Sequence, residues 1–354
     1  MSEIRQMLRD TAQGHLARSY DFERRRAIAA GSGFDPAQWQ AFAEMGWLAA
    51  AVPEAQGGLG GLTEAAVVAE AFGGALVLEP YLPFVQSAAL LADREALIAG
   101  SELIVPAFAE GASRGSLSHV ATRAEDNRLT GRKSVVLGAP VADGFIVSAR
   151  TRGADGDVDG ITLFRVAADA PGLSLVPTRL LDGSPAGDLR LDHVAGEIVG
   201  ELHQGHALLR TAREAAIIVA GAEMLGMIGR VLTLSIEHLV TRKQFGVPLA
   251  SFQVLQHRIA DMVIDEELAR AAHEVALHAL DEPDPRERDR AFLAAHTVTA
   301  EAARQVCASG IQLHGGMGMT DEHPVSHYLR RIVVLDALLG APDRHVEQFV
   351  ALAA

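Results

Sequence analysis

The chain has 354 residues, of which 49% are hydrophobic, and its 31 basic and 45 acidic side chains give a net charge of −14. This length predicts two or three packed subdomains, and the acidic balance excludes nucleic acid and anionic membrane surfaces as expected partners. The single cysteine, Cys307, rules out an intrachain disulfide. The charged N-terminus shows no signal peptide, and the most apolar run, residues 215–229, contains Glu223 and is shorter than the ~20 residues of a membrane span. We therefore expect a soluble, cytoplasmic protein without membrane insertion.

The first part of the chain is predicted to be helical. Asp35 and Pro36 form an N-cap followed by a first-turn proline, and the apolar residues of 37–45 recur at helical spacing. Residues 56–61 are glycine-rich, but no strand precedes them and no P-loop lysine follows, so they predict a turn. Thr63 is expected to cap a helix over residues 64–72. These features define a predicted N-terminal helical domain over residues 1–102.

The pattern changes at Leu103, where short β-type runs begin. Glycine, aspartate and proline separate the runs, which are residues 103–109, 128–137, 143–149, 161–166 and 173–177. Strands that are grouped between helical blocks favour a small β-domain, here residues 103–200, over a doubly wound sheet.

Helical patterns return at His206 and continue to the end of the chain, which predicts a helical domain over residues 201–354. Leu255, Ile259, Met262 and Val263 form an apolar stripe on one of its helices, and residues 282–290 are expected to be a charged loop between long helices. The predicted fold class is therefore α+β.

Two segments of the helical C-terminal part indicate a ligand. Residues 242–253 begin with Arg242, whose planar guanidinium suits a phosphate, and continue with Gln244, a neutral donor and acceptor. Residues 312–324 contain Gly315 and Gly316, which allow a backbone to approach a ligand closely and to donate its N–H groups to a pyrophosphate. Each segment alone also fits a helix-ending turn with surface residues. The ordered pair, about 70 residues apart, makes that reading weaker.

At these two segments, together with residues 46–48 and 52–54, the chain resembles the acyl-CoA dehydrogenase family. The resemblance covers nearly the whole chain and implies an N-terminal helical domain, a middle β-barrel-like domain and a C-terminal four-helix bundle. It also implies a tetramer with FAD that oxidises an acyl-CoA substrate to a trans-2-enoyl-CoA and passes electrons to an electron-transfer flavoprotein. By resemblance, the residues that contact the pyrophosphate and adenine half of an FAD held by the neighbouring subunit are Arg242, Gln244, Phe245, Leu249, Phe252, Gln312, Gly315 and Gly316.

The chain departs from the family pattern at the catalytic base. The family's usual glutamate falls on Leu339, which is followed by Gly340 and by Ala341, a residue without the family's hydroxyl. The alternative base of some members falls on Ala216. Glu214 is the nearest carboxylate, but two residues at ~100° each turn it to a different face of a helix. We expect it to be a solvated or paired residue, and it is a weak candidate base.

The positions that face the flavin ring have also changed. Ala109, Val135 and Leu137 stand where the family usually has threonine, tryptophan and threonine. The losses thus fall on the base and the ring pocket, whereas the pyrophosphate and adenine half is kept. This combination of lost and retained residues resembles that of the small subunits of heteromeric acyl-CoA dehydrogenases, such as the pimeloyl-CoA dehydrogenase small subunit and steroid side-chain dehydrogenases. It implies a heterotetramer with a full-length partner subunit, which carries the ring pocket and the base.

Two alternatives remain open, namely a self-sufficient homotetramer with an unrecognised base and a non-redox helical scaffold that has lost FAD. Glu110 is expected to form a structural hydrogen bond. His203 and His206 lack a third ligand, so no metal site is predicted, and His314 and His323 are expected to be packing or phosphate-proximal groups. The acyl chain cannot be derived from the residues, and the resemblance points only to dicarboxylic or steroid-type acyl groups.

Overall fold

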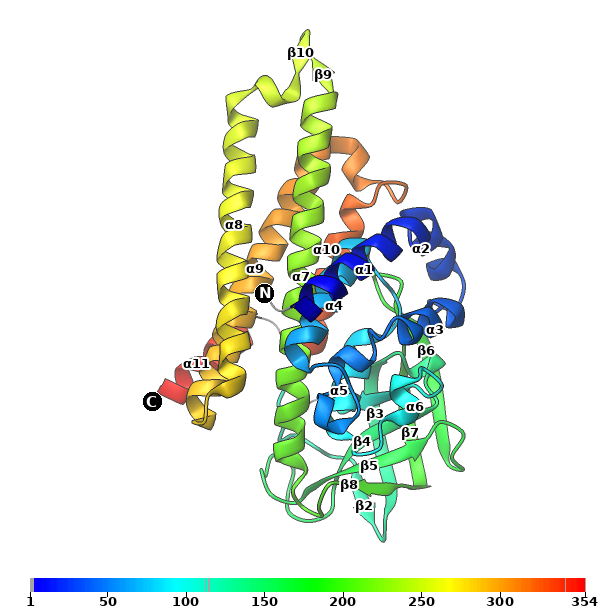
Figure 1. The fold of residues 1–354 in the computed structure, drawn as a ribbon. Helices are drawn as coiled ribbons and strands as arrows, with labels where there is room; N and C mark the ends of the chain where they lie inside the picture. Colours follow the sequence, from blue (N-terminus) through cyan, green and yellow to red (C-terminus); the bar gives the residue numbers. More distant parts are fainter. Residues whose placement is uncertain (1–2, 112, 114, 341, 354) are drawn as a thin grey trace. The chain divides into compact units, whose positions relative to one another are not determined.

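The computed structural model describes residues 3–111, 113, 115–340 and 342–353, with helices at both ends of the chain and strands between them (Figure 1). The N-terminal helices are α1 (Glu3–Ser19), α2 (Phe22–Ala30), α3 (Pro36–Glu44), α4 (Leu62–Ala75), α5 (Tyr81–Leu90) and α6 (Glu95–Ile98). The strands are β1 (Ile104–Ala107), β2 (Arg123–Glu125), β3 (Arg128–Leu137), β4 (Gly144–Arg150), β5 (Ile161–Ala167), β6 (Leu173–Arg179), β7 (Pro185–Ala195) and β8 (Glu197–Val199). The C-terminal elements are α7 (Gly205–Thr241), the hairpin β9 (Lys243–Gln244) and β10 (Val247–Pro248), α8 (Gln253–His278), α9 (Pro285–His314), α10 (Val325–Leu339) and α11 (Pro342–Ala353).

This element order confirms the predicted α+β fold, while the limits of the three predicted domains stay a prediction. By contacts the chain divides into two compact units. The helical unit comprises Met1–Arg25, Ala66–Val77 and Ile217–Ala354, and the sheet unit comprises Arg26–Ala65 and Leu78–Ala216. Helix α7 belongs to the sheet unit up to Ala216 and to the helical unit from Ile217 onward.

The described strands β1–β8 form one mixed sheet in the order β6-β7-β3-β2-β4-β5-β8, and β1 pairs in parallel with β4. The predicted strand over residues 128–137 matches β3, and the other four predicted runs correspond to β1, β4, β5 and β6. Strands β2, β7 and β8 were not predicted. In β7, proline, glycine and aspartate interrupt the apolar residues, so the sequence resembles a turn although buried and exposed residues alternate along its second half.

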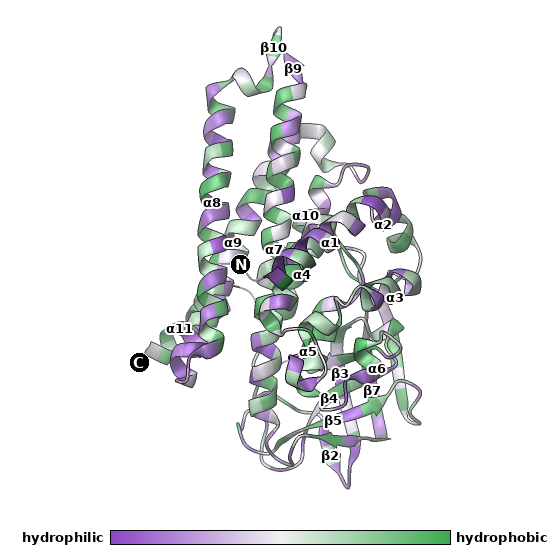
Figure 2. Ribbon diagram, viewed as in Figure 1, coloured by the Kyte–Doolittle hydropathy of each residue, from purple (hydrophilic) through white to green (hydrophobic). Residues whose placement is uncertain are grey.

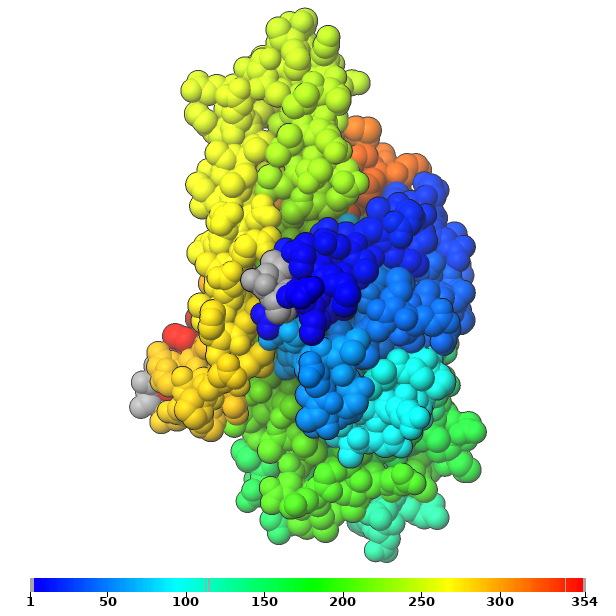
Figure 3. Space-filling model, viewed as in Figure 1, coloured from blue at the N-terminus to red at the C-terminus, as the bar shows by residue number. Residues whose placement is uncertain are grey.

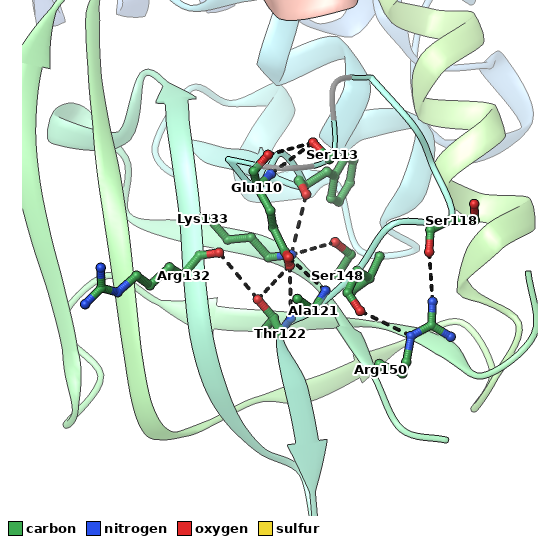
Figure 4. Close-up of polar contacts among 11 residues, drawn as sticks. Glu110, Ser113, Ser118, Ala121, Thr122, Arg132, Lys133, Ser148 and Arg150 are labelled. Atoms are coloured by element: carbon green, nitrogen blue, oxygen red, sulfur yellow. Dashed lines mark hydrogen bonds and ion pairs between the residues drawn. The ribbon is translucent and has the colours of Figure 1, made fainter. Parts of the chain in front are cut away.

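A buried ion pair lies inside the sheet unit (Figure 4). Lys133 on β3 has a fully buried side chain, and its Nζ lies 2.6 Å from Glu110 Oε1 and 3.0 Å from Ser148 Oγ. Glu110 also accepts from the N–H of Ala121 at 2.8 Å and from the hydroxyl of Thr122 at 2.8 Å. Burial acts to raise the pKa of Glu110, but Lys133 and the Thr122 hydrogen bonds outweigh it and hold this pKa below its usual value. The expected structural hydrogen bond of Glu110 is therefore confirmed.

A second buried cation, Arg150 on β4, binds backbone carbonyls instead of a carboxylate (Figure 4). Its guanidinium donates to the carbonyl oxygens of Ser118, Val120, Asp157 and Asp159 at 2.8–3.1 Å. Four carbonyl acceptors satisfy the donors of a group that could not otherwise be buried. Arg150 thereby fixes two loops against the strand.

In the helical unit, α4 and α7 are in backbone contact. A Cβ atom built on Gly73 would lie 1.9 Å from the carbonyl oxygen of Glu223, and one built on Gly226 would lie 1.8 Å from that of Glu70. Both distances are far below a van der Waals contact, so only glycine fits at either position. The two glycines set the distance between α4 and α7.

Contacts between charged residues hold α10 against α4 and α7. The Glu223 carboxylate on α7 accepts from Nε and Nη2 of Arg331 on α10 at 2.6 and 3.1 Å, and both residues are buried. Arg25, also buried, donates to the carbonyl of Leu76 at 3.1 Å and lies 3.2 Å from Nδ1 of His327. These contacts join α2, the end of α4, α7 and α10.

Within the described residues, α7 is the helix that is long and apolar enough to meet the criteria for a membrane span. Its most apolar window is 83% buried inside the protein, as expected of a core helix. Glu223, which the sequence places in this window, has a buried partner in Arg331. The burial of α7 is therefore explained by packing within the protein.

Local predictions at helix ends were partly right. Asp35 caps α3 as predicted, since its side chain accepts from the N–H of Ala37 at 3.0 Å. Thr63 does not cap α4, because that helix begins one residue earlier, at Leu62. The predicted charged loop over residues 282–290 was largely wrong. Asp284 is an N-cap and α9 begins at Pro285, whose missing N–H is tolerated in a first turn.

The ion pair in the sheet unit predicts an asymmetric mutational effect. Lys133→Met leaves Glu110 buried beside polar groups but without its counter-charge, which should cost about 3–5 kcal/mol of unfolding free energy. The double variant Lys133→Met/Glu110→Gln removes both charges and should recover a large part of that loss. Urea unfolding at pH 7 measures both variants. Equal destabilisation by the single and double variants would contradict the pairing.

Acid sensitivity is predicted at a buried histidine pair. His296 on α9 is 1% exposed, its ring nitrogens have no hydrogen-bond partner among the described residues, and its ring lies 4.8 Å from that of His345 on α11. Burial, and secondly His345, lower the pKa of His296 to about 3. Between about pH 3 and the histidine pKa of about 6.5 in the unfolded chain, the unfolded chain therefore binds a proton at this position and the folded chain does not. Stability should rise with pH between these two values, by up to about 1.4 kcal/mol per pH unit.

His296→Leu should flatten this acid dependence. Urea unfolding midpoints at pH 7.5, 5.5 and 4.5 provide the measurement, and His257→Gln, which changes an exposed histidine on α8, is the control. A His296→Leu variant that loses stability in acid as steeply as the unmodified protein would refute this assignment.

Candidate functional site

The first predicted motif forms the connection between α7 and α8. Arg242 follows the last residue of α7, and Lys243–Gln244 pairs with Val247–Pro248 in a two-residue hairpin. Phe245 and Gly246 form the turn with φ values of 52° and 82°, as a type I′ turn requires. The amide of Leu249 donates to the Arg242 carbonyl at 2.8 Å and closes the connection. The hairpin that carries these residues therefore lies at the end of α7 and α8, in the yellow-green segment at the top of the space-filling view (Figure 3).

Side chains of this hairpin are turned to solvent. Arg242 and Gln244 are exposed, and the Arg242 guanidinium has no ion-pair or hydrogen-bond partner among the described residues. Phe245 is 91% exposed, and its ring lies 6.2 Å from that of Phe252 in an edge-on arrangement. Leu249 is half-buried. An unpaired guanidinium and an exposed aromatic ring are typical of a surface that another molecule covers.

The second predicted motif forms the connection between α9 and α10. Helix α9 ends at His314, Gly315 has a φ of 60°, and Gly315–Met319 form a short 3-10 helix. A Cβ atom at Gly315 or Gly316 would meet nothing within 4 Å, so open space lies beside both backbones. Gln312 is exposed one turn before the glycines. The segment presents backbone and an amide side chain to a ligand.

The structure brings the two motifs together. His238, one turn before Arg242 on α7, and His314, next to Gly315, have ring centroids 4.6 Å apart. The exposed guanidinium and the open glycine backbone consequently lie at the same end of the helical unit. An exposed cation beside glycines that leave open space for a close approach suits a diphosphate, so the residues present fit the pyrophosphate of a nucleotide such as FAD.

The positions of the expected base carry no acid or base group. Ala216 lies in α7 and is 0% exposed, and Leu339 is the last residue of α10 and is half-buried. Ala341 lies outside the described residues. Glu214 is half-buried on α7 and has interactions with neighbouring groups, in line with a paired structural residue.

The three positions that the resemblance expects to face the flavin ring, Ala109, Val135 and Leu137, lie in the sheet unit. Ala109 is exposed, and its carbonyl accepts from the N–H of Ser134 at 2.9 Å, which places it beside Val135. Val135 is 42% exposed at a bulge of β3, with a φ of 52° that is unfavourable for a β-branched residue. Leu137 is buried. The sheet thus presents small and aliphatic groups at these positions, with none of the hydroxyls or indole expected there.

Sequence reasoning missed His238. It lies within a long helix, and its only sequence signal is its position one turn before Arg242. Its proximity to His314 depends on the packing of α7 against α9. His203 has a different environment from the other histidines, since its Nδ1 lies 2.8 Å from the Thr151 hydroxyl. Among the described residues, no group of three or more histidine, cysteine, aspartate or glutamate side chains is placed to hold a metal ion.

Comparison with known proteins identifies the family. The N-terminal domain of acyl-CoA dehydrogenases matches residues 2–93, and the C-terminal domain matches residues 204–351. The acyl-CoA dehydrogenase IpdE2 of Mycobacterium tuberculosis is 33% identical over 343 residues, which cover 96% of this chain and 94% of the relative.

Solved structures of acyl-CoA dehydrogenases are similar to this chain over nearly its whole length. The Tcur3481–Tcur3483 steroid acyl-CoA dehydrogenase has a TM-score of 0.89 at 28% identity, covering 99% of this chain and 97% of that one. The ChsE4–ChsE5 complex from Mycobacterium tuberculosis has a TM-score of 0.87 at 26% identity, with coverages of 99% and 97%. Relatives in this family bind FAD, and PigA, which shares the fold, has been solved as an FAD complex. Family domains match both ends of this chain, and a relative that is 33% identical covers 96% of this chain. This chain therefore belongs to the acyl-CoA dehydrogenase family.

Proposed function

We propose that this chain is a non-catalytic subunit of a heteromeric acyl-CoA dehydrogenase and that it completes the FAD site of a partner subunit. The observation that carries the proposal is the contrast between two sets of residues. The exposed Arg242 and the open backbone of Gly315 and Gly316 suit a diphosphate, whereas Ala216 and Leu339 stand where a base is expected.

The diphosphate end would be held by groups of this chain that point away from its own core. Arg242 supplies a charge-assisted contact, Gln244 a neutral hydrogen bond, and Gly315 and Gly316 the close backbone approach. Phe245, Leu249, Phe252 and Gln312 would line the adenine side. FAD supplies the redox chemistry of the complex, and this chain binds and orients it.

Removal of the α-proton needs a carboxylate whose pKa suits its environment. A methyl group at Ala216 and an isobutyl group at Leu339 cannot accept a proton. The base and the ring pocket are therefore assigned to the partner. The substrate of the complex is proposed to be an acyl-CoA with a steroid-type or dicarboxylic acyl group, because steroid dehydrogenases are among the similar structures.

Exposed hydrophobic side chains on the helical unit support an assembly. The hairpin exposes Phe245 and Val247. Hydrophobic residues alternate with hydrophilic ones along α8 (Figure 2), and several of them are exposed. Those on α8 are Val254, Val263, Ile264, Leu268 and Val275. Ile264, Leu268 and Val275 recur at helical spacing on one side of α8, and a contiguous exposed apolar surface marks an interaction site. Two similar structures are described as paired subunits, Tcur3481–Tcur3483 and ChsE4–ChsE5, which favours a related chain as the partner. An electron-transferring flavoprotein is the proposed electron acceptor.

The purified chain alone should show negligible turnover of acyl-CoA substrates. Without a positioned base, a factor of ~10²–10⁴ in rate is missing. The measurement is acyl-CoA oxidation with ferrocenium as the electron acceptor, comparing the chain alone with its complex. Leu339→Glu should not restore activity, since Ala109, Val135 and Leu137 are unchanged. Rapid turnover by the isolated chain would instead favour the self-sufficient homotetramer with another base, such as Glu214.

Arg242→Ala should strip FAD from the complex although the ring pocket belongs to the partner. Loss of a charge-assisted contact of ~1.5–3 kcal/mol weakens affinity by ~10- to 150-fold. Bound flavin per complex after gel filtration gives the result, with circular dichroism to confirm folding. Arg258→Ala, which removes an exposed arginine from α8, is the matched control. A folded Arg242→Ala complex that keeps all its flavin would favour the non-redox scaffold.

A further inference from the structure

Three histidine rings from separate segments meet beside Arg242. His238 comes from the last turns of α7, His314 ends α9, and His323 lies in the connection before α10. The ring centroids of His238 and His314 are 4.6 Å apart, and those of His314 and His323 are also 4.6 Å apart. His314 is buried, and the other two are half-buried. We call these three residues the histidine cluster.

Hydrogen bonds define the protonation of two of these rings. Nδ1 of His314 lies 2.7 Å from the carbonyl oxygen of Gly310, which can only accept, so Nδ1 carries the proton of the neutral ring. Nδ1 of His323 accepts from the N–H of Val325 at 3.3 Å, so the proton of that ring lies on Nε2.

The surroundings of His238 and His323 disfavour the protonation of these two rings. Burial, followed by His314 and Arg242, lowers the pKa of His238, and burial, followed by His314 and His238, lowers the pKa of His323. The nearby carboxylates in sequence are Glu237, Asp321 and Glu322, and Asp321 is engaged with Arg330 at 2.5 Å. Among the described residues, no carboxylate forms an ion pair with any of the three rings.

An anion bound at the adjoining motif would favour protonation of these rings. Gly315 directly follows His314 and has open space beside its backbone, and Arg242 follows His238 by four residues with an unpaired guanidinium. A phosphate group placed there would bring negative charge to rings that lie near the Arg242 cation and that have no ion-paired carboxylate among the described residues. Opposite charge nearby favours the protonated form of an imidazole.

We propose that the histidine cluster takes up a proton when a nucleotide diphosphate binds at Arg242, so that the affinity of this site for the diphosphate of FAD rises as pH falls. The inference rests on the proposed function, because it assumes that the diphosphate of a partner-held FAD reaches Arg242. It assigns a role in the same site to His238, His314 and His323, none of which needs to touch the flavin ring.

The sign of the effect follows from linkage. A bound diphosphate raises the proton affinity of the cluster, so the bound state holds more protons than the free state near neutral pH. Affinity must then fall as pH rises, by at most ~10-fold per pH unit for one proton. Because the proton is shared among three groups, we expect a ~3- to 10-fold loss of FAD affinity per unit between pH 6 and pH 8.

The test uses the purified assembly of this chain, stripped of flavin. Isothermal titration with FAD in two buffers of different ionisation enthalpy gives the number of protons taken up, and ADP and inorganic phosphate serve as further probes. The unmodified assembly should take up ~0.5–1 proton per site with FAD, whose diphosphate has no proton of its own to exchange near neutral pH. His238→Gln/His323→Gln spares the buried His314 and should bind with little proton uptake and a flat pH profile. His257→Gln on α8 is the matched control and should behave like the unmodified assembly.

The outcomes separate this inference from the proposed function. If Arg242→Ala abolishes tight FAD binding while the double histidine variant keeps the full proton uptake, the histidine cluster has no such role and the proposed function stands. If Arg242→Ala binds FAD normally, the proposed function fails and the inference with it. Proton uptake with inorganic phosphate but not with ADP or FAD would show a site for free phosphate and would also overturn the inference.

Discussion

Backbone contact between α4 and α7 fixes the helix on which most of the described features depend. A methyl group at Gly73 or Gly226 would overlap a carbonyl oxygen of the facing helix, so this distance tolerates no larger residue. On the same helix, Glu223 pairs with Arg331 of α10, and farther along, His238 meets His314 of α9. Because an α-helix is stiff over these few turns, the glycine contact also determines where Arg242 emerges. The candidate site thus depends on packing that lies several turns away from it.

The features that sequence could predict are those set by local chemistry. The cap at Asp35, the extent of β3 and the exposed Arg242 and Gly315 follow from side chains within a few residues. Strand β7 could not be predicted, because its pairing with β3 outweighs the turn preferences of its proline and glycine. The proximity of His238 to His314 likewise depends on tertiary packing, as does the left-handed backbone of Val135 at the bulge of β3. The start of α9 at Pro285 was missed although Asp284 and Pro285 are a local cap signal.

The contrast between the diphosphate end and the missing base has a simple energetic basis. A buried carboxylate without partners costs several kcal/mol or remains protonated, so an enzyme retains one only where the reaction requires it. Ala216, fully buried within α7, carries no such cost. Arg242 and Gln244 lie on the surface, where keeping a charged and a polar group costs the fold little. A subunit that binds the cofactor of another chain would therefore keep its polar surface groups and replace a buried carboxylate by an apolar residue.

The exposure of Phe245 has a consequence for the turnover of unassembled subunits. A phenylalanine that is 91% exposed at a hairpin tip, in a left-handed conformation, is at a disadvantage in water until another molecule covers it. In the proposed complex, a copy made in excess of its partner would keep this ring and the apolar face of α8 open to chaperones and proteases. The hairpin that completes the cofactor site would thereby also mark surplus subunits for removal, and the cellular amount of this chain would follow that of its partner.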